Sequence, residues 1–187
     1  MSQRIEKDFI FDNAIHFNKS FFLNRYEMTL SMLVETSDIH DQNTALNRIN
    51  HLMEMSISMG IWISEKDTAA IKKYKNAGIN ICTTPDQPYD QTLSTVLLQK
   101  CNAITEGRVV VTDLILGSTF SEGIRFHTVM EVAEETLDAS SNKWWNCNSP
   151  CTEHREASDG NIVKLFNDEW ETLDLSFNKK VKKTKSS

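Results

Sequence analysis

The strongest constraint on the fold is a continuous structural signal over residues 85–130, which predicts one long helix that leads into a β-hairpin. Apolar residues such as Leu93 and Leu97 recur at helical spacing. Pro88 and Asp90 stand before them, where a fixed proline φ and an acidic group near the positive end of the helix dipole favour a helix start. The pattern therefore predicts an amphipathic helix that buries one side.

The hairpin begins after Gly107. Residues 109–116 are rich in β-branched side chains and almost free of charge, which is typical of a strand covered on both faces. A turn containing glycine and serine at 117–123 returns the chain into a second strand pattern formed by Ile124, Phe126, Thr128 and Met130. We therefore expect the two strands to pair antiparallel.

This pairing brings Asp113, the only ionisable residue of the first strand, close to His127. A carboxylate that raises the pKa of a neighbouring imidazole and orients its ring is suited to general acid–base catalysis, so both residues are candidate catalytic groups. The alternative is structural, with Asp113 accepting backbone N–H groups and His127 lying half-exposed on its strand.

Strand and helix patterns also alternate before residue 85. Met28, Leu30, Met32 and Val34 recur at every second position, which marks a half-buried strand, and a helical stripe follows at 45–57 with Asn43 as its expected cap. A short strand, a helix ending at Gly78 and another short strand complete the series. The aromatic-rich residues 1–26 predict one or two short strands that close over the core.

The predicted fold class is mixed α/β, a single layered domain with the order β-α-β-α-β-α-β-β. The domain is expected to span residues 1–178, with an irregular loop rich in tryptophan and cysteine at 143–160 and a last strand at 162–166 in a carboxy-terminal β/irregular extension. Residues 179–187 are expected to form a basic, disordered tail, since they hold five lysines and no acid.

The charge pattern limits the partners. The 187-residue chain has a formal net charge of −6, and its lysine-rich tail leaves the body more acidic still. An acidic body disfavours a broad nucleic-acid surface, so nucleic acid is expected to contact only the lysines between 179 and 185, and weakly. Neither a membrane-spanning run nor a secretory signal is recognisable, which predicts a cytoplasmic protein with no membrane partner.

Cys147, Cys151 and His154 have the spacing C-x3-C-x2-H, and are weak candidates for a zinc site. A fourth ligand would be Cys82, Cys101, His127 or solvent. The alternative is a surface loop with reduced cysteines, as is usual in a reducing cytoplasm. Apart from this zinc, no cofactor is expected.

Trp144 and Trp145 are candidate binding residues. Adjacent side chains on an extended strand face opposite ways, so one ring would be exposed and could anchor a protein partner. The alternative is that both rings pack against the body across a bend.

The segments 84–91 and 102–108, with Trp144, Trp145 and residues 168–170, resemble small accessory proteins of tailed bacteriophages, whose role is not established. The resemblance implies action inside an infected bacterium, in host cytoplasm, or in virion assembly, and it carries over no functional residue.

No complete catalytic motif is present, including the glycine-rich phosphate-binding loops. The leading hypothesis is therefore a non-catalytic intracellular accessory protein that binds another protein through the 144–154 loop and the hairpin face. A small metal-dependent hydrolase or nucleic-acid-processing enzyme with a Cys/His zinc site is the alternative, and a phage structural or assembly protein is a further one. The sequence does not decide whether the protein is an enzyme, although it favours a protein that is not one. It gives no information on the oligomeric state.

Overall fold

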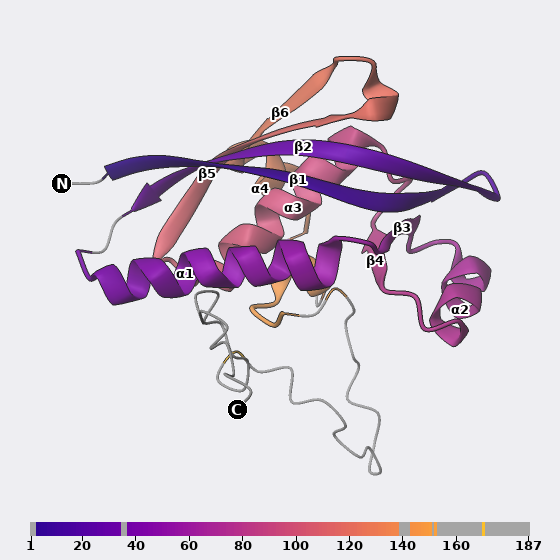
Figure 1. The fold of residues 1–187 in the computed structure, drawn as a ribbon, viewed down its shortest axis with the longest axis horizontal. Helices are drawn as coiled ribbons and strands as arrows, with labels where there is room; N and C mark the ends of the chain where they lie inside the picture. The colour runs from indigo at the N-terminus through magenta and orange to yellow at the C-terminus, as the bar shows by residue number, and fades with distance from the viewer. Residues whose placement is uncertain (1–2, 35–36, 139–142, 151, 153–169, 171–187) are drawn as a thin grey trace, which may run out of the picture.

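A computed structural model describes residues 3–34, 37–138, 143–150, 152 and 170 (Figure 1). Its centre is one six-stranded sheet with the order β4-β3-β1-β2-β5-β6. β1 pairs antiparallel with β2, β2 with β5, and β5 with β6, whereas β3 runs parallel to both β1 and β4. The strands are β1 (Gln3–Phe17), β2 (Ser20–Val34), β3 (Ile61–Ser64), β4 (Ile81–Thr84), β5 (Val109–Ser118) and β6 (Arg125–Val129).

Helices cover the sheet unequally, as Figure 1 shows, with α1 and α3 beneath the long hairpin and α2 beside β3 and β4. They are α1 (Ile39–His51), which continues into a π-helical turn (Leu52–Ile57), α2 (Thr68–Asn76), α3 (Asp90–Thr105) and α4 (Met130–Thr136). Short 3-10 turns follow at Thr119–Ser121 and Trp144–Asn146. None of the described helices is both long and apolar enough to cross a membrane.

The main core forms between one face of the sheet and α1 and α3. Alternate residues of β2 supply it, and Met28, Leu30 and Met32 are all at most 2% exposed. Side chains alternate between faces along a strand, so a second, smaller cluster lies on the opposite face where α2 packs on Ile61 and Ile63. Most of that opposite face is polar, with cross-strand pairs such as Arg25–Asp12 at 2.8 Å.

The predicted mixed α/β fold is confirmed, and the order β-α-β-α-β-α-β-β is observed from β2 onward. The prediction for residues 1–26 was wrong, because they form the whole of β1 and the first part of an equally long β2 rather than short strands. The tight connection is possible because Asn18 and Lys19 both adopt positive φ, as a two-residue hairpin turn requires.

Two further details also differ from the sequence-based expectations. α1 begins at Ile39 rather than after Asn43, because the side chain of Asp38 accepts the backbone N–H of His40 and caps the helix there. β5 is not covered on both faces, since Val109, Val111 and Leu114 are buried while Ile115 is half-exposed. The predicted strand at 162–166 and the basic tail lie outside the described residues, and the proposed domain boundary stays a prediction.

Lys100 joins α3 to the segment that carries the Trp144–Asn146 turn. Its side chain is fully buried, and Nζ donates to the carbonyl oxygens of Trp144, Cys147 and Ser149 at 2.8, 2.8 and 2.6 Å. The same ammonium group lies 5.6 Å from the centre of the Trp144 ring. A buried cation is tolerated here because carbonyl dipoles and an aromatic face replace the water it has lost.

Arg48 and Glu106 form a second buried connection, where α1 passes the end of α3. Arg48 donates to the Ile104 carbonyl at 3.0 Å and to Glu106 at 2.8 Å, and its guanidinium lies over the Trp170 ring. The hydrogen bond from Arg108, with further bonds from Asn148 and Arg48, lowers the pKa of Glu106 to about 2. Glu106 is therefore held as a carboxylate by three donors.

Replacing Lys100 by methionine removes the donor from one buried and two partly buried carbonyl groups. We expect the free energy of unfolding to fall by about 2–4 kcal/mol, since each unsatisfied buried polar group costs about 1–3 kcal/mol. Urea denaturation measures the change. Lys72→Met, at an exposed position of α2, is the matched control and should cost less than about 0.5 kcal/mol. Equal losses in the two variants would contradict the role given to Lys100.

Glu106→Gln tests the second connection through its dependence on pH. The folded pKa lies below the value of about 4.3 in an unfolded chain, so the carboxylate stabilises the fold above that value and ceases to do so as the pH falls towards 2. Allowing for partial exposure, we expect a loss of about 1–2 kcal/mol at pH 7 that shrinks between pH 5 and pH 2.

Glu122→Gln is the control for this measurement, because Glu122 has the same left-handed backbone conformation as Glu106, with φ values of 48° and 52°. Denaturant midpoints across the pH range would compare the two variants with the parent protein. A pH-independent loss in Glu106→Gln would show that the charge of Glu106 is not what stabilises this junction.

Candidate functional site

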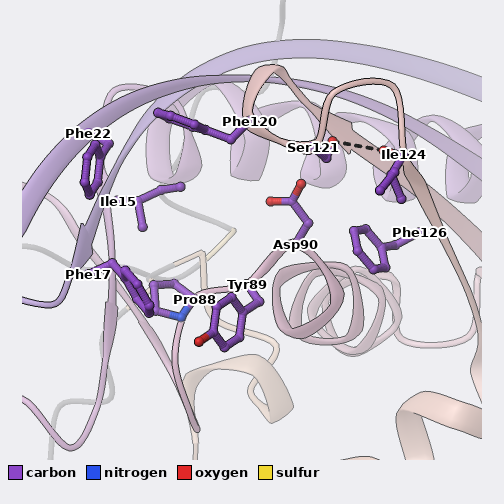
Figure 2. Close-up of a pocket in the computed structure, with 10 residues that line it drawn as sticks. All are labelled: Ile15, Phe17, Phe22, Pro88, Tyr89, Asp90, Phe120, Ser121, Ile124 and Phe126. Carbon is purple, nitrogen blue, oxygen red and sulfur yellow. Dashed lines mark hydrogen bonds between the residues drawn. The ribbon is translucent and has the colours of Figure 1, made fainter.

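A pocket of about 370 Å³ opens where the tip of the β1–β2 hairpin, the start of α3 and the β5–β6 connection meet (Figure 2). These three segments are far apart in sequence and are brought together only by the sheet order. The pocket is lined by Ile15, Phe17 and Phe22 from the hairpin, Pro88, Tyr89 and Asp90 from the start of α3, and Phe120, Ser121, Ile124 and Phe126 from the β5–β6 region.

The walls are mainly aromatic. The rings of Phe17 and Tyr89 lie 5.5 Å apart, and those of Phe22 and Phe120 meet edge to face at 5.7 Å. Ile124 is 61% exposed and Phe120 is 56% exposed. Large apolar groups that gather around a concavity while open to solvent indicate a binding surface, because a folded chain ordinarily buries such groups.

Asp90 is the one carboxylate of this lining, and Figure 2 shows its side chain directed into the space between the walls. Its Oδ2 accepts the hydroxyl hydrogen of Ser118 at 2.6 Å. Within the described part of the chain, Oδ1 has no side-chain hydrogen bond. Asp90 is the first residue of α3, so it lies at the end of the helix where backbone N–H groups are free and the dipole is positive.

Local structure holds this carboxylate in place. Pro88 and the extended Tyr89 lead into the helix, so Asp90 sits at its first position. Ser118 is fixed in turn by Ser121, whose hydroxyl oxygen accepts the Ser118 backbone N–H at 2.9 Å. The site therefore has one oriented acceptor in an otherwise apolar concavity.

The predicted neighbours Asp113 and His127 do lie together, with Oδ1 and Nε2 3.0 Å apart. They are on the open face of the sheet and do not line the pocket. The hydrogen bond from Thr112 is the main cause that lowers the pKa of Asp113, opposed by partial burial and assisted by His127 and by the charge of Arg4. This arrangement fits the structural alternative, and a catalytic role for the pair stays a prediction.

Trp144 and Trp145 are each only 2% exposed and belong to the main core. Trp144 also donates from Nε1 to the Thr83 carbonyl at 3.0 Å. As placed, neither ring is open to a partner, and the alternative arrangement, with both rings packed against the body, is the one observed. The reason is the 3-10 turn, which replaces the extended strand assumed for these residues.

Of the candidate zinc ligands, Cys151 and His154 lie outside the described residues. Cys147 is described, and its Sγ lies 3.3 Å from the Lys143 carbonyl oxygen. The described residues contain no group of three or more histidine, cysteine or acidic side chains placed to hold a metal ion. A zinc site at Cys147, Cys151 and His154 stays a prediction.

The sequence analysis missed the pocket. It interpreted Asp90 only as a favourable helix start, and the aromatic residues before position 26 only as core. A usable signal was present: Phe17, Phe22 and Tyr89 are large aromatic residues beside turn-forming residues, where exposure is the rule. What the sequence lacked was the order of the strands, which decides that these residues meet.

No protein-family model matches the chain, and no curated protein matches it. Solved structures do resemble it. An uncharacterised protein of Wolinella succinogenes has 9% identity and a TM-score of 0.49 over 70% of this chain and 99% of its own. A catalytic-residue variant of Plasmodium vivax 6-pyruvoyltetrahydropterin synthase has 7% identity and a TM-score of 0.42 over 70% and 99%. The Plasmodium falciparum synthase has 7% identity and a TM-score of 0.40 over 69% and 99%.

These similarities concern the fold. The sequence-based hypothesis of a non-catalytic protein-interaction protein is corrected, because the similar structures include a synthase, one of them with a catalytic residue replaced. The resemblance to tailed-bacteriophage proteins stays a prediction, since none of these structures bears on it.

Phe120→Ala tests whether the exposed aromatic wall binds apolar molecules. The ring is half-exposed, so we expect the free energy of unfolding to change by less than about 1 kcal/mol. Affinity for the neutral dye Nile red, measured by fluorescence titration, should fall by about fivefold, as the loss of roughly 1 kcal/mol of apolar contact implies. Ile39→Ala, at a 66% exposed position far from the pocket, should leave dye binding unchanged. An equal loss in both variants would mean that the dye binds elsewhere.

Proposed function

We propose that this protein binds a small organic molecule in the Asp90 pocket, and that the molecule has an apolar, ring-sized body with a cationic or hydrogen-bond-donating group. One observation carries this proposal: a single oriented carboxylate projects into a pocket whose other walls are almost wholly apolar. Sites for small molecules commonly combine these two features, an apolar lining for affinity and a few polar groups for orientation.

The size of the pocket supports a compact ligand. Its volume of about 370 Å³ lies near the lower end of the range of about 300–1,000 Å³ that is usual for small-molecule sites. The aromatic rings around Asp90 favour a flat body, because ring faces and edges pack against one another at centre distances of about 4.5–7 Å. A large polymer would not fit within this concavity.

The charge of the site supports a positive or donor group on the ligand. Asp90 offers acceptor atoms only, and one of its oxygens already receives the Ser118 hydroxyl. A cation or N–H donor that meets the remaining oxygen forms a charge-assisted hydrogen bond, which is about twice as strong as a neutral one. An anionic ligand would meet like charge in apolar surroundings and is disfavoured.

Phenethylamine is a suitable probe because it combines one aromatic ring with one ammonium group. We expect calorimetric titration to show binding of phenethylamine that is at least about tenfold tighter than binding of the neutral phenethyl alcohol, which matches a charged hydrogen bond worth about 1.5–3 kcal/mol. The anion hydrocinnamate should bind more weakly than either compound.

Asp90→Asn keeps the shape of the side chain and removes its charge, so the preference for the amine should disappear. Asp86→Asn is the matched control: Asp86 lies on the same connection, but its side chain is 70% exposed and pairs with Lys66. Failure of all three ring compounds to bind the parent protein, or an unchanged preference in Asp90→Asn, would refute the proposed function.

A further inference from the structure

The core-facing side chains of the β1–β2 hairpin form successive cross-strand pairs. Ile15 pairs with Phe22, and both line the Asp90 pocket. The next pair inward on the same face is Asn13 with Asn24, and the pair after that is Phe11 with Tyr26. Side chains two residues apart on a strand share a face, so the polar groups of Asn13, Asn24 and Tyr26 follow directly behind the pocket wall.

In each asparagine, one of the two polar atoms of the side-chain amide forms a hydrogen bond. Asn13 donates from Nδ2 to the Ile57 carbonyl at 2.6 Å, and Asn24 Oδ1 accepts the Thr119 hydroxyl at 2.5 Å. Both side chains are thereby held in fixed orientations. The other halves, Asn13 Oδ1 and Asn24 Nδ2, are buried and have no hydrogen-bond partner among the described residues.

Tyr26 adds a third such atom. Its side chain is fully buried and its ring stacks on Phe11 with centres 5.0 Å apart, yet its hydroxyl also lacks a partner within the described chain. Burial is the main cause that raises the pKa of Tyr26 well above its usual value; the Asn24 amide opposes this rise and the charge of Asp90 adds to it, so the hydroxyl stays neutral.

Three neighbouring unpartnered polar atoms are unusual in a folded protein, where most buried polar groups form hydrogen bonds. Leaving such a group unpaired costs about as much as a lost hydrogen bond, and an apolar residue of similar shape would avoid the cost. None of the three residues lines the pocket itself, but they follow its wall pair Ile15–Phe22 on the same face, so a ligand group that displaces this wall would meet them.

We propose that Asn13, Asn24 and Tyr26 form an inner polar subsite of the Asp90 pocket, which binds an uncharged hydroxyl or amide group of the ligand. This inference rests on the proposed function. It specifies a second polar group of the ligand, at the end opposite to the group that binds Asp90. The chemistry follows from the three atoms: an amide oxygen accepts, an amide nitrogen donates, and a tyrosine hydroxyl does both. None of the three carries a charge to balance an ionic group.

The experiment uses phenethylamines that differ only in a ring substituent, so that the ammonium group reports on Asp90 and the substituent on the inner subsite. Two of the probes, meta-tyramine and tyramine, carry the hydroxyl group at different ring positions and so at different distances from the ammonium group. The third, para-methylphenethylamine, has a shape similar to that of tyramine but lacks the polar atom. We expect one of the tyramines to bind at least about tenfold tighter than the methyl compound in calorimetric titrations, since the buried polar groups gain partners only from the hydroxyl.

Tyr26→Phe removes one unpartnered hydroxyl and little else. In this variant the preference for the hydroxyl compound should fall to about twofold or less, as the loss of one hydrogen-bonding partner implies. Its melting temperature without ligand should equal or exceed that of the parent protein, because the hydroxyl has no hydrogen-bond partner among the described residues. A purely structural tyrosine would show the reverse, a lower melting temperature and unchanged selectivity.

Tyr74→Phe provides the matched control, since it makes the same chemical change at a hydroxyl that does have a partner, 3.0 Å from His16 Nδ1. We expect this variant to melt at a lower temperature and to keep the ligand preference of the parent protein.

The outcomes separate the two proposals. Binding of the amines that depends on Asp90 but ignores the ring hydroxyl would leave the proposed function standing and overturn the inner subsite. A lowered melting temperature in Tyr26→Phe would also overturn it, because the hydroxyl would then have a structural partner. If no phenethylamine binds, the proposed function fails and the inner subsite fails with it.

Discussion

The pairing of β1 with β2 is the interaction on which the rest of the structure depends. The two strands are 15 residues each and pair along their whole length, so one register decides which face every side chain of the hairpin occupies. The hairpin also lies in the middle of the sheet, with β3 added on one side and β5 on the other. A shift of one residue would exchange Met28, Leu30 and Met32 for polar neighbours such as Glu27, Thr29 and Ser31 in the core, which fixes the register strongly.

The same register produces the pocket. Along one face of the hairpin the side chains change from apolar core at Met28, through the aromatic Tyr26 and the amide Asn24, to the half-open Phe22 near the tip. The helix that covers this face, α3, begins level with the tip and contributes Asp90 there. The hydrophobic core ends before the tip of the hairpin, and this leaves an apolar concavity. Asp90, the first residue of the helix, gives the concavity its one charged group.

Several features of the fold were readable from the chain. The helix over residues 90–105 and the hairpin after Gly107 followed from spacing and turn chemistry, because both depend on neighbours in sequence. The proximity of Asp113 and His127 was also predictable, since a short hairpin allows few registers. The burial of Trp144 and Trp145 could not be decided in this way, because Lys100, which is distant in sequence, holds the segment that carries them through the carbonyl groups of Trp144, Cys147 and Ser149.

The sequence by itself determined the local elements of this protein: the apolar period of α3, the β-branched run of β5 and the positive-φ turns at Gly78 and Gly107. These are fixed by backbone geometry and by burial of one side of each element, which act over a few residues. Only the tertiary structure decided that the hairpin tip, the start of α3 and the β5–β6 connection surround Asp90. Strand order is set by the summed packing of the entire sheet, and no short stretch of the chain contains that information.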